Sequence, residues 1–226
     1  MSGMTSETER VRGIWDKLAP RYEKDIKFFE RMLFSGGRSW ACSQAGGVVL
    51  EIAVGTGRNL EYSPPGIQLL GIDVSPRMIA IAQQRALALG HQADLHVGDA
   101  QALDIPDESV DTVISTLSLC SIPDDRKAVS EVKPVLRPGG RFILMEHIAS
   151  PLRLVRVFQK ALDWIAVRTG QSAVRPSSSG PSVVSGGATQ ASPHRSVSWS
   201  RAAAIPYRQL RPVESRRHGS SCLPGT

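Results

Sequence analysis

Short apolar runs alternate with helix-like segments through the middle of the chain. The runs have the length and composition of buried strands, and they cover residues 47–54, 68–74, 93–100, 110–122 and 141–148. Strands that alternate with helices at this spacing favour a parallel sheet, and the right-handed crossover rule leaves few arrangements open. We therefore predict an α/β fold, a Rossmann-like doubly wound parallel sheet with a strand order near 3-2-1-4-5.

The helix boundaries between these strands carry recognisable signals. Ser75 is expected to cap a helix that has Pro76 at its first position and Gly90 at its end. Asp124 or Asp125 should start the next helix. Pro134 should kink or end that helix before "RPGG".

Three regions differ in composition. Residues 1–46 are rich in aromatic residues at roughly helical spacing, which predicts an N-terminal helical cap of two or three short helices, broken near Pro20 and at Gly36-Gly37. Residues 47–168 form the sheet domain, and their last segment, 151–168, should be a helix lying on the sheet. A basic helix in peripheral contact with a membrane surface is the alternative for that segment. Residues 169–226 are a tail.

The tail carries the whole excess charge of the chain. Its seven arginines and single acid, Glu214, account for the net charge of +6. A Ser/Pro/Arg-rich segment with few large apolar residues cannot offset its ordering entropy, so we expect it to be disordered. The charge therefore says nothing about the folded part, and nucleic-acid binding is not expected.

The remaining composition points to a reduced, cytoplasmic protein. The three cysteines lack C-x-x-C spacing, no apolar run has transmembrane length, and the first residues lack the apolar core of a signal peptide. His91 and His96 have no ligand partner at metal spacing, so no metal is expected. No pattern in the chain indicates an oligomeric state.

Four successive strand ends are chemically marked. Parallel sheets bind ligands at the carboxyl ends of their strands. The marks are Gly55-Thr56-Gly57, Asp73, Gly98-Asp99-Ala100 and Ser115-Thr116-Leu117. Each is weak alone, because a glycine pair is often a tight turn and an aspartate is often a cap. Together they favour a nucleoside site. Leu60 replaces the third glycine of the dinucleotide loop, which argues against a nicotinamide oxidoreductase.

Five stretches of the sequence resemble the motifs of one family. "VVLEIAVGTGRNL", "GIDVSPRMIAIAQQRA", "VGDAQAL", "VDTVISTLSLCSIPD" and "LRPGGRFILMEH" are similar to those of class I S-adenosylmethionine-dependent methyltransferases. The nearest subgroup is that of quinone C-methyltransferases and bacterial phosphatidylethanolamine N-methyltransferases. "YSPPG", "TLSLCSI" and "MEHIAS" also resemble vertebrate alkyl-thiol methyltransferase-like proteins. The resemblance covers roughly residues 10 to 168.

The resemblance implies S-adenosyl-L-methionine as cofactor, together with a set of residues around it. Glu51 would support its amino group, the glycine loop would line its amino-acid end, and Asp73 would accept the ribose hydroxyls. The full implied set is Glu51, Ala53, Gly55, Thr56, Gly57, Asp73, Val74, Met78, Asp99, Ala100, Thr116 and Leu117. The cap would form a lid, with Tyr22 near the cofactor. The equal alternative is that its aromatic residues pack on the sheet as core, and both roles are compatible.

Three departures from the family pattern stand out: Ala53, Pro134 in the helix before "RPGG" and, the largest, the C-terminus. Ala53 occupies the position of the first family glycine. After the helix at 151–168, nothing resembles the family's last strands, and the patches "SVVS" and "RAAAIPY" are too short to predict a hairpin. We expect a replaced C-terminus from about residue 170.

The sequence thus predicts transfer of a methyl group to a small, lipophilic acceptor such as a quinone, a lipid amine or a thiol. The alternative is a protein that binds the cofactor but is catalytically impaired by its C-terminus. No catalytic dyad is present. His147, beside Glu146, is a candidate general base, although a role in orienting a loop is favoured for it.

Overall fold

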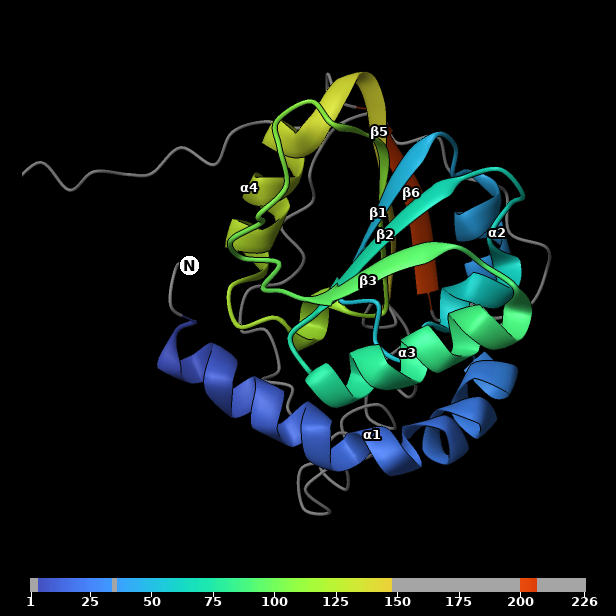
Figure 1. Cartoon of the computed structure of the whole chain (residues 1–226), viewed down its shortest axis with the longest axis vertical. Coiled ribbons are helices and arrows are strands. Elements are labelled where there is room, and N and C mark those ends of the chain that lie inside the picture. Colours follow the sequence, from blue (N-terminus) through green and yellow to red (C-terminus); the bar gives the residue numbers. More distant parts are fainter. Residues whose placement is uncertain (1–3, 34–35, 148–199, 207–226) are drawn as a thin grey trace, which may run out of the picture.

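The computed structural model describes residues 4–33, 36–147 and 200–206 of the chain (Figure 1). Its elements, in chain order, are α1 (Ser6–Leu33), α2 (Gly37–Ser43), β1 (Val48–Ile52), the 3-10 helix η1 (Arg58–Tyr62), β2 (Gln68–Asp73), α3 (Pro76–Leu89), β3 (Ala93–Val97), β4 (Val110–Thr116), the 3-10 helix η2 (Leu119–Ser121), α4 (Asp125–Val135), β5 (Leu136–His147) and β6 (Ser200–Pro206).

The sheet has the order β3-β2-β1-β4-β5-β6. The first five of these strands are mutually parallel, so the predicted 3-2-1-4-5 arrangement is confirmed. The strand order reverses between β1 and β4: β2 and β3 lie on one side of β1, whereas β4 and β5 lie on the other. This switch point is where an open α/β sheet binds its ligand.

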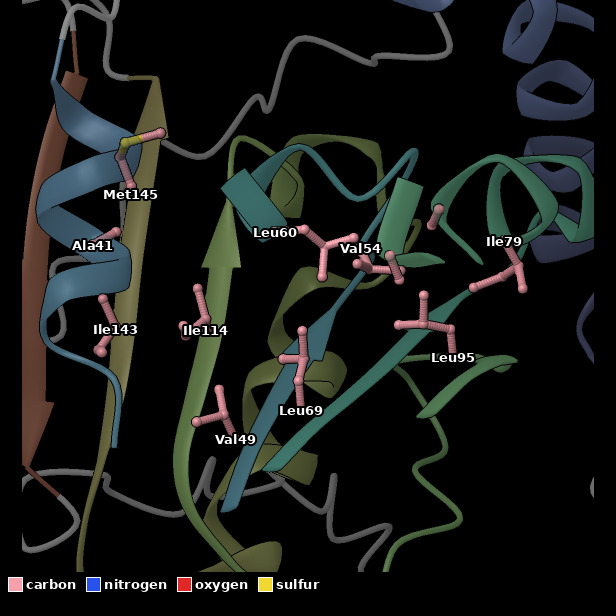
Figure 2. Close-up of a cluster of buried hydrophobic side chains, with 12 residues drawn as sticks. Ala41, Val49, Val54, Leu60, Leu69, Ile79, Leu95, Ile114, Ile143 and Met145 are labelled. Atoms are coloured by element: carbon pink, nitrogen blue, oxygen red, sulfur yellow. The ribbon is translucent and has the colours of Figure 1, made fainter. Parts of the chain in front are cut away.

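Helices cover both faces of the sheet, and each face has its own apolar core. On one face, Leu50, Val113 and Phe142 pack against α4 through Ala128 and Val132. On the other, residues of the sheet pack against α2 and α3 (Figure 2). The strands of β1 and β4 are buried on both sides, which explains their continuous apolar runs in the sequence.

The predicted helix boundaries are confirmed. The Ser75 hydroxyl accepts a hydrogen bond from the Met78 backbone N–H at 3.1 Å, Pro76 starts α3, and Gly90 ends it with a left-handed φ of 70°. Asp124 caps α4 in the same manner, accepting from the Lys127 N–H at 2.9 Å. The helix α4 ends one residue after Pro134.

The predicted break near Pro20 is wrong. The helix α1 runs through this residue for 28 residues in all, and the chain first breaks before α2, where Gly36 has a left-handed φ of 81°. A proline removes the N–H that would bond to the carbonyl four residues earlier, here that of Asp16. The Arg77 guanidinium of α3 donates to that carbonyl at 3.5 Å and supplies a replacement donor.

The segment "RAAAIPY", predicted to be too short for a hairpin and to belong to a disordered tail, contributes a strand instead. Residues 200–206 form β6, which pairs antiparallel with β5 from Arg141↔Pro206 to His147↔Ser200. The segment is too short to signal a strand by itself. It pairs along the outer edge of the 12-residue β5, which supplies the backbone partners. The predicted helix at 151–168 and most of the predicted disordered tail lie outside the described residues.

The strand β5 enters the sheet through an irregularity at its "RPGG" segment. Its pairing with β4 jumps from Val110↔Leu136 to Thr112↔Arg141. At this jump the backbones approach closely, since a Cβ on Gly140 would lie 2.9 Å from the Arg137 carbonyl oxygen and 3.0 Å from that of Asp111. Glycine is required there because neither carbonyl can move independently of the sheet.

We expect Gly140→Ala to lower the free energy of unfolding by about 1–3 kcal/mol, because the new methyl group meets backbone on two sides. Gly13→Ala on α1 is the matched control. Its Cβ would meet nothing within 4 Å, and alanine is the better helix former, so stability should stay level or rise. Urea unfolding followed by circular dichroism measures both. Equal effects of the two substitutions would contradict the close approach at Gly140.

Candidate functional site

A cavity of about 780 Å³, part of it open to solvent, lies at the carboxyl ends of the parallel strands. Segments that follow β1, β2, β3 and β4 line it, together with α1 and Arg38 of α2. Ten of the twelve site residues predicted from the sequence border this cavity: Ala53, Gly55, Thr56, Asp73, Val74, Met78, Asp99, Ala100, Thr116 and Leu117. Glu51 and Gly57 do not border it.

The Asp73 carboxylate at the end of β2 is held by two backbone donors. The Gly55 N–H donates to Oδ2 at 2.9 Å and the Ser75 N–H donates to Oδ1 at 2.9 Å. The side chain thereby ties the glycine loop after β1 to the start of α3. The remaining acceptor capacity of both oxygens is available to a ligand in the cavity.

Burial raises the pKa of Asp73 to about 6. The Ser75 and Gly55 hydrogen bonds oppose this shift, and the negative charge of Asp16 adds to it. Donors supplied by a ligand would stabilise the charged form and lower the pKa again. The residue is therefore suited to recognising paired hydroxyl groups.

The loop after β1 uses left-handed backbone at three positions. Ala53, Gly55 and Gly57 have φ values of 52°, 57° and 73°. A Cβ on Gly55 would meet no protein atom within 4 Å, so the loop leaves open space beside the cavity. A Cβ on Gly57 would instead lie 2.7 Å from Leu60 Cδ1, so this glycine serves packing beneath the loop.

Asp99, after β3, lies at the opposite end of the cavity from β4. Its Oδ1 accepts from the Gln101 N–H at 2.9 Å, and Oδ2 accepts from the Thr8 hydroxyl of α1 at 3.3 Å. The Gln101 amide also donates to both Asp99 oxygens and to the Thr8 hydroxyl. The first turns of α1 thus contact this acid directly.

A buried polar cluster lies beneath the glycine loop. The Asn59 amide donates to Glu51 Oε1 at 2.9 Å and to Thr116 Oγ1 at 3.0 Å. Arg38 Nη1 donates to Asn59 Oδ1 at 2.9 Å and to Thr116 Oγ1 at 2.8 Å. The cluster joins β1, η1, α2 and β4 at their meeting point.

Glu51 is 3% exposed, and burial raises its pKa to about 8. The Arg38 charge and the Asn59 hydrogen bond lower the pKa, while the Asp73 charge raises it, but desolvation dominates. The side chain is therefore mostly protonated at neutral pH. It lies under the loop instead of in the cavity.

Polar side chains of α1 hold the helix over the cavity. Glu23 accepts from the Thr56 hydroxyl at 2.5 Å and forms ion pairs with Arg58 and Arg85 at 2.8 and 2.7 Å. Burial alone would raise the pKa of Glu23, but these hydrogen bonds and charges outweigh it and lower the pKa.

A second polar contact of α1 lies at the start of α3, where Asp16 accepts from the Ser75 hydroxyl at 2.6 Å. Trp15 and Tyr22, which pack edge to face at 5.9 Å, line the cavity between these contacts.

The segment after β4 is fixed by Glu146 of β5. One carboxylate oxygen accepts from the backbone N–H groups of Ser118 and Leu119 at 3.0 and 2.9 Å. Desolvation raises the pKa of Glu146, although these donors oppose the shift. Leu117 in this segment has a left-handed φ of 56°. His147 is the last residue of β5, and its side chain is outside the described part.

Sequence reasoning missed Arg38, Asn59, Glu23 and Asp16. None of them lies at one of the four marked strand ends, although Asn59 is part of the stretch "VVLEIAVGTGRNL", and most of their contacts join segments far apart in the chain. A buried glutamate at the end of β1 was the only hint that a cationic or amide partner would be needed.

Two absences hold for the described residues. Within 4–33, 36–147 and 200–206, no group of three or more His, Cys, Asp or Glu side chains could hold a metal ion. No described helix is long and apolar enough to cross a membrane.

Comparison with known proteins adds three findings. Residues 50–144 match a family model described as "Methyltransferase domain". A ubiquinone/menaquinone biosynthesis C-methyltransferase of Geobacter sulfurreducens is 28% identical over 69% of this chain and 65% of its own length. A thiol S-methyltransferase of Homo sapiens is 33% identical over 63% of this chain and 60% of its own length.

A solved structure is also similar. A SAM-dependent methyltransferase of Thermotoga maritima, described as a possible histamine N-methyltransferase, is 26% identical with a TM-score of 0.53, over 66% of this chain and 67% of that one. The chain spans less than two thirds of the length of the two relatives above.

We expect Ala53→Gly to raise the free energy of unfolding by about 0.5–1 kcal/mol, because the Cβ of an alanine at positive φ is in steric conflict with the backbone and glycine has no Cβ. Ala80→Gly, at an exposed position inside α3, is the control and should cost about 1 kcal/mol. Both are measured by urea unfolding. Destabilisation by Ala53→Gly would contradict the left-handed conformation.

The raised pKa of Glu51 makes stability depend on pH. The folded state keeps a proton that the unfolded state loses above about 4.5, so this contribution is fully present below that pH and is lost as pH rises to about 8. Glu51→Gln keeps an oxygen acceptor for Asn59 and cannot ionise. We expect it to match the wild type near pH 4 and to exceed it by about 1–3 kcal/mol at pH 9. Parallel stability curves for the two proteins would show that Glu51 ionises normally.

Proposed function

The chain belongs to the class I S-adenosylmethionine-dependent methyltransferases, and we propose that its cavity binds S-adenosyl-L-methionine and directs methyl transfer to a small, lipophilic acceptor. The observation that carries this proposal is the convergence of four strand ends on one cavity, with the Asp73 carboxylate held toward it by Gly55 and Ser75.

The residues present fit such a cofactor. Asp73 offers acceptors to a pair of ribose hydroxyls, and the open space beside Gly55 admits a chain close to the backbone. Val74, Met78 and Ala100 offer apolar contacts to a base, beside the polar edge of Asp99.

In the proposed reaction, the protein acts by positioning. When bound, the cofactor would supply a sulfonium methyl group: an electron pair of the acceptor would form the new bond to the methyl carbon, the electrons of the broken C–S bond would return to sulfur, and the acceptor's proton would pass to water. The loop after β4 and the aromatic side chains of α1 would orient the acceptor. Holding the two reactants in line can supply about 7–11 kcal/mol of the barrier, so a strong general base is not required.

Apolar side chains in the lining of the cavity support a lipophilic substrate. Val11, Trp15, Leu117, Ile122 and Pro123 are among the residues that border it. The names of the similar proteins span quinone carbon, thiol sulfur and amine nitrogen, so the acceptor atom differs within the family. We propose that apolar shape, more than a catalytic side chain, selects the acceptor here.

The cofactor site is tested by titrating the full chain with S-adenosylhomocysteine in a calorimeter. Affinity should rise between about pH 5 and 7, because ionised Asp73 binds the hydroxyls better and burial raises its pKa to about 6. Asp73→Asn should weaken binding by about 10- to 100-fold and remove this pH dependence.

Asp104→Asn, at an exposed position, is the charge-matched control and should bind like the wild type. Absence of binding by folded wild type would overturn the proposal. Binding without turnover of quinol, amine or thiol acceptors would favour the alternative, a cofactor-binding protein that is catalytically impaired.

A further inference from the structure

The segment after β4, residues 117–124, contributes apolar side chains to the lining of the cavity. Its members that border the cavity are Leu117, Ser118, Ser121, Ile122 and Pro123. Leu117 packs against the core on one face of the sheet, and Ile122 packs against the core on the other. The position of these side chains therefore depends on how the chain turns where it leaves β4.

The turn begins with a residue in an unfavourable conformation. Leu117 has a left-handed φ of 56°, in which the Cβ of a leucine crowds the backbone. Such a conformation persists only where the surrounding structure over-determines it. The Leu117 N–H donates to the Met145 carbonyl at 2.7 Å, and the next two N–H groups, of Ser118 and Leu119, both donate to one oxygen of Glu146. Three successive backbone donors thus hold the turn against β5.

Glu146 acts on this turn from outside the cavity. It is not among the described residues that border the cavity. Hydrogen bonds from N–H groups to a carboxylate are roughly twice as strong as those to a neutral oxygen. The hydroxyls of Ser115 and Ser118 lie 2.7 Å apart and brace the same corner. Loss of the carboxylate would leave two backbone donors unpaired and release the turn at Leu117.

The far end of the segment is held by a different residue. The Asp124 N–H, at the start of α4, donates to Gln101 Oε1 at 3.0 Å. The Gln101 amide also donates to both oxygens of Asp99 and to the Thr8 hydroxyl. Gln101 therefore serves both a proposed cofactor contact and the segment after β4, whereas the hydrogen bonds of Glu146 go to the corner at the end of β4.

We propose that Glu146 is a positioning residue for the methyl acceptor. By fixing the turn at Leu117, it sets the shape of the apolar lining against which the acceptor lies, and it does so without contact with either ligand. The inference rests on the proposed function and assigns a specificity-determining role to a residue of β5. Acceptor binding should respond to a change at Glu146, while cofactor binding should not.

The test uses two probes, S-adenosylhomocysteine for the cofactor and 2-naphthol, a bicyclic aromatic alcohol, for the acceptor. The full chain is titrated in a calorimeter, first with S-adenosylhomocysteine and then, once saturated, with 2-naphthol. We expect Glu146→Met to weaken 2-naphthol binding by about 10- to 100-fold and to change S-adenosylhomocysteine binding less than about threefold. Equal weakening of both probes would overturn the inference in favour of a structural role.

The conservative variant keeps the test decisive even if Glu146→Met does not fold. Glu146→Gln keeps an oxygen for the two N–H groups but lacks the charge, so 2-naphthol should bind about three- to tenfold more weakly than to the wild type. The Ser118 and Leu119 amides should also exchange with deuterium faster in this variant. An unchanged 2-naphthol affinity, or unchanged exchange of these amides, would overturn the inference.

Two further variants and the wild type separate the remaining outcomes. Gln101→Met should weaken both probes, because the Gln101 amide also holds Asp99. Glu61→Met, at an exposed position on η1, is the control for loss of a carboxylate and should bind both probes like the wild type. Wild type that binds S-adenosylhomocysteine but not 2-naphthol would overturn the inference and leave the proposed cofactor site standing. Absence of S-adenosylhomocysteine binding would overturn both.

Discussion

The two hydrogen bonds to the Asp73 carboxylate organise the site. One comes from the glycine loop after β1 and the other from the start of α3, so a single side chain sets the distance between two strand ends and a helix. The same carboxylate is nearly buried, which makes these donors necessary and leaves its charge sensitive to any further partner. The structure of the site and the proposed recognition of the cofactor therefore depend on the same acid.

The helix α1 extends this arrangement to the cover of the cavity. Thr8, Asp16 and Glu23 are spaced by seven or eight residues, so they lie on one side of the helix. They contact Asp99, Ser75 and Thr56, which follow β3, β2 and β1 respectively. These three contacts are made to segments that border the cavity, so a displacement of α1 would also affect these loops.

Local signals in the sequence were sufficient to predict most strands of the sheet and the helices between them. The apolar runs, the Ser75 cap and the Gly90 end predicted elements whose bounds depend on neighbouring residues. The break predicted at Pro20 was wrong because the donor that replaces its missing N–H, the Arg77 guanidinium, is 57 positions away in the chain. It reaches the Asp16 carbonyl only in the folded state. The strand β6 and the role of Arg38 were missed for the same reason, since an edge partner and a buried polar cluster are formed by long-range packing.

The lining of the cavity has two origins. Asp73, Asp99 and the glycine loop come from strand ends, so the topology of the sheet determines where they lie. The segment after β4 and the aromatic side chains of α1 also border the cavity, and the topology does not constrain their residue types. Proteins of this fold can therefore share the strand-end residues and differ in the rest of the lining. In this chain Glu146 holds the segment after β4 by its backbone N–H groups, which leaves the side chains of Ser121, Ile122 and Pro123 free to vary without loss of its shape.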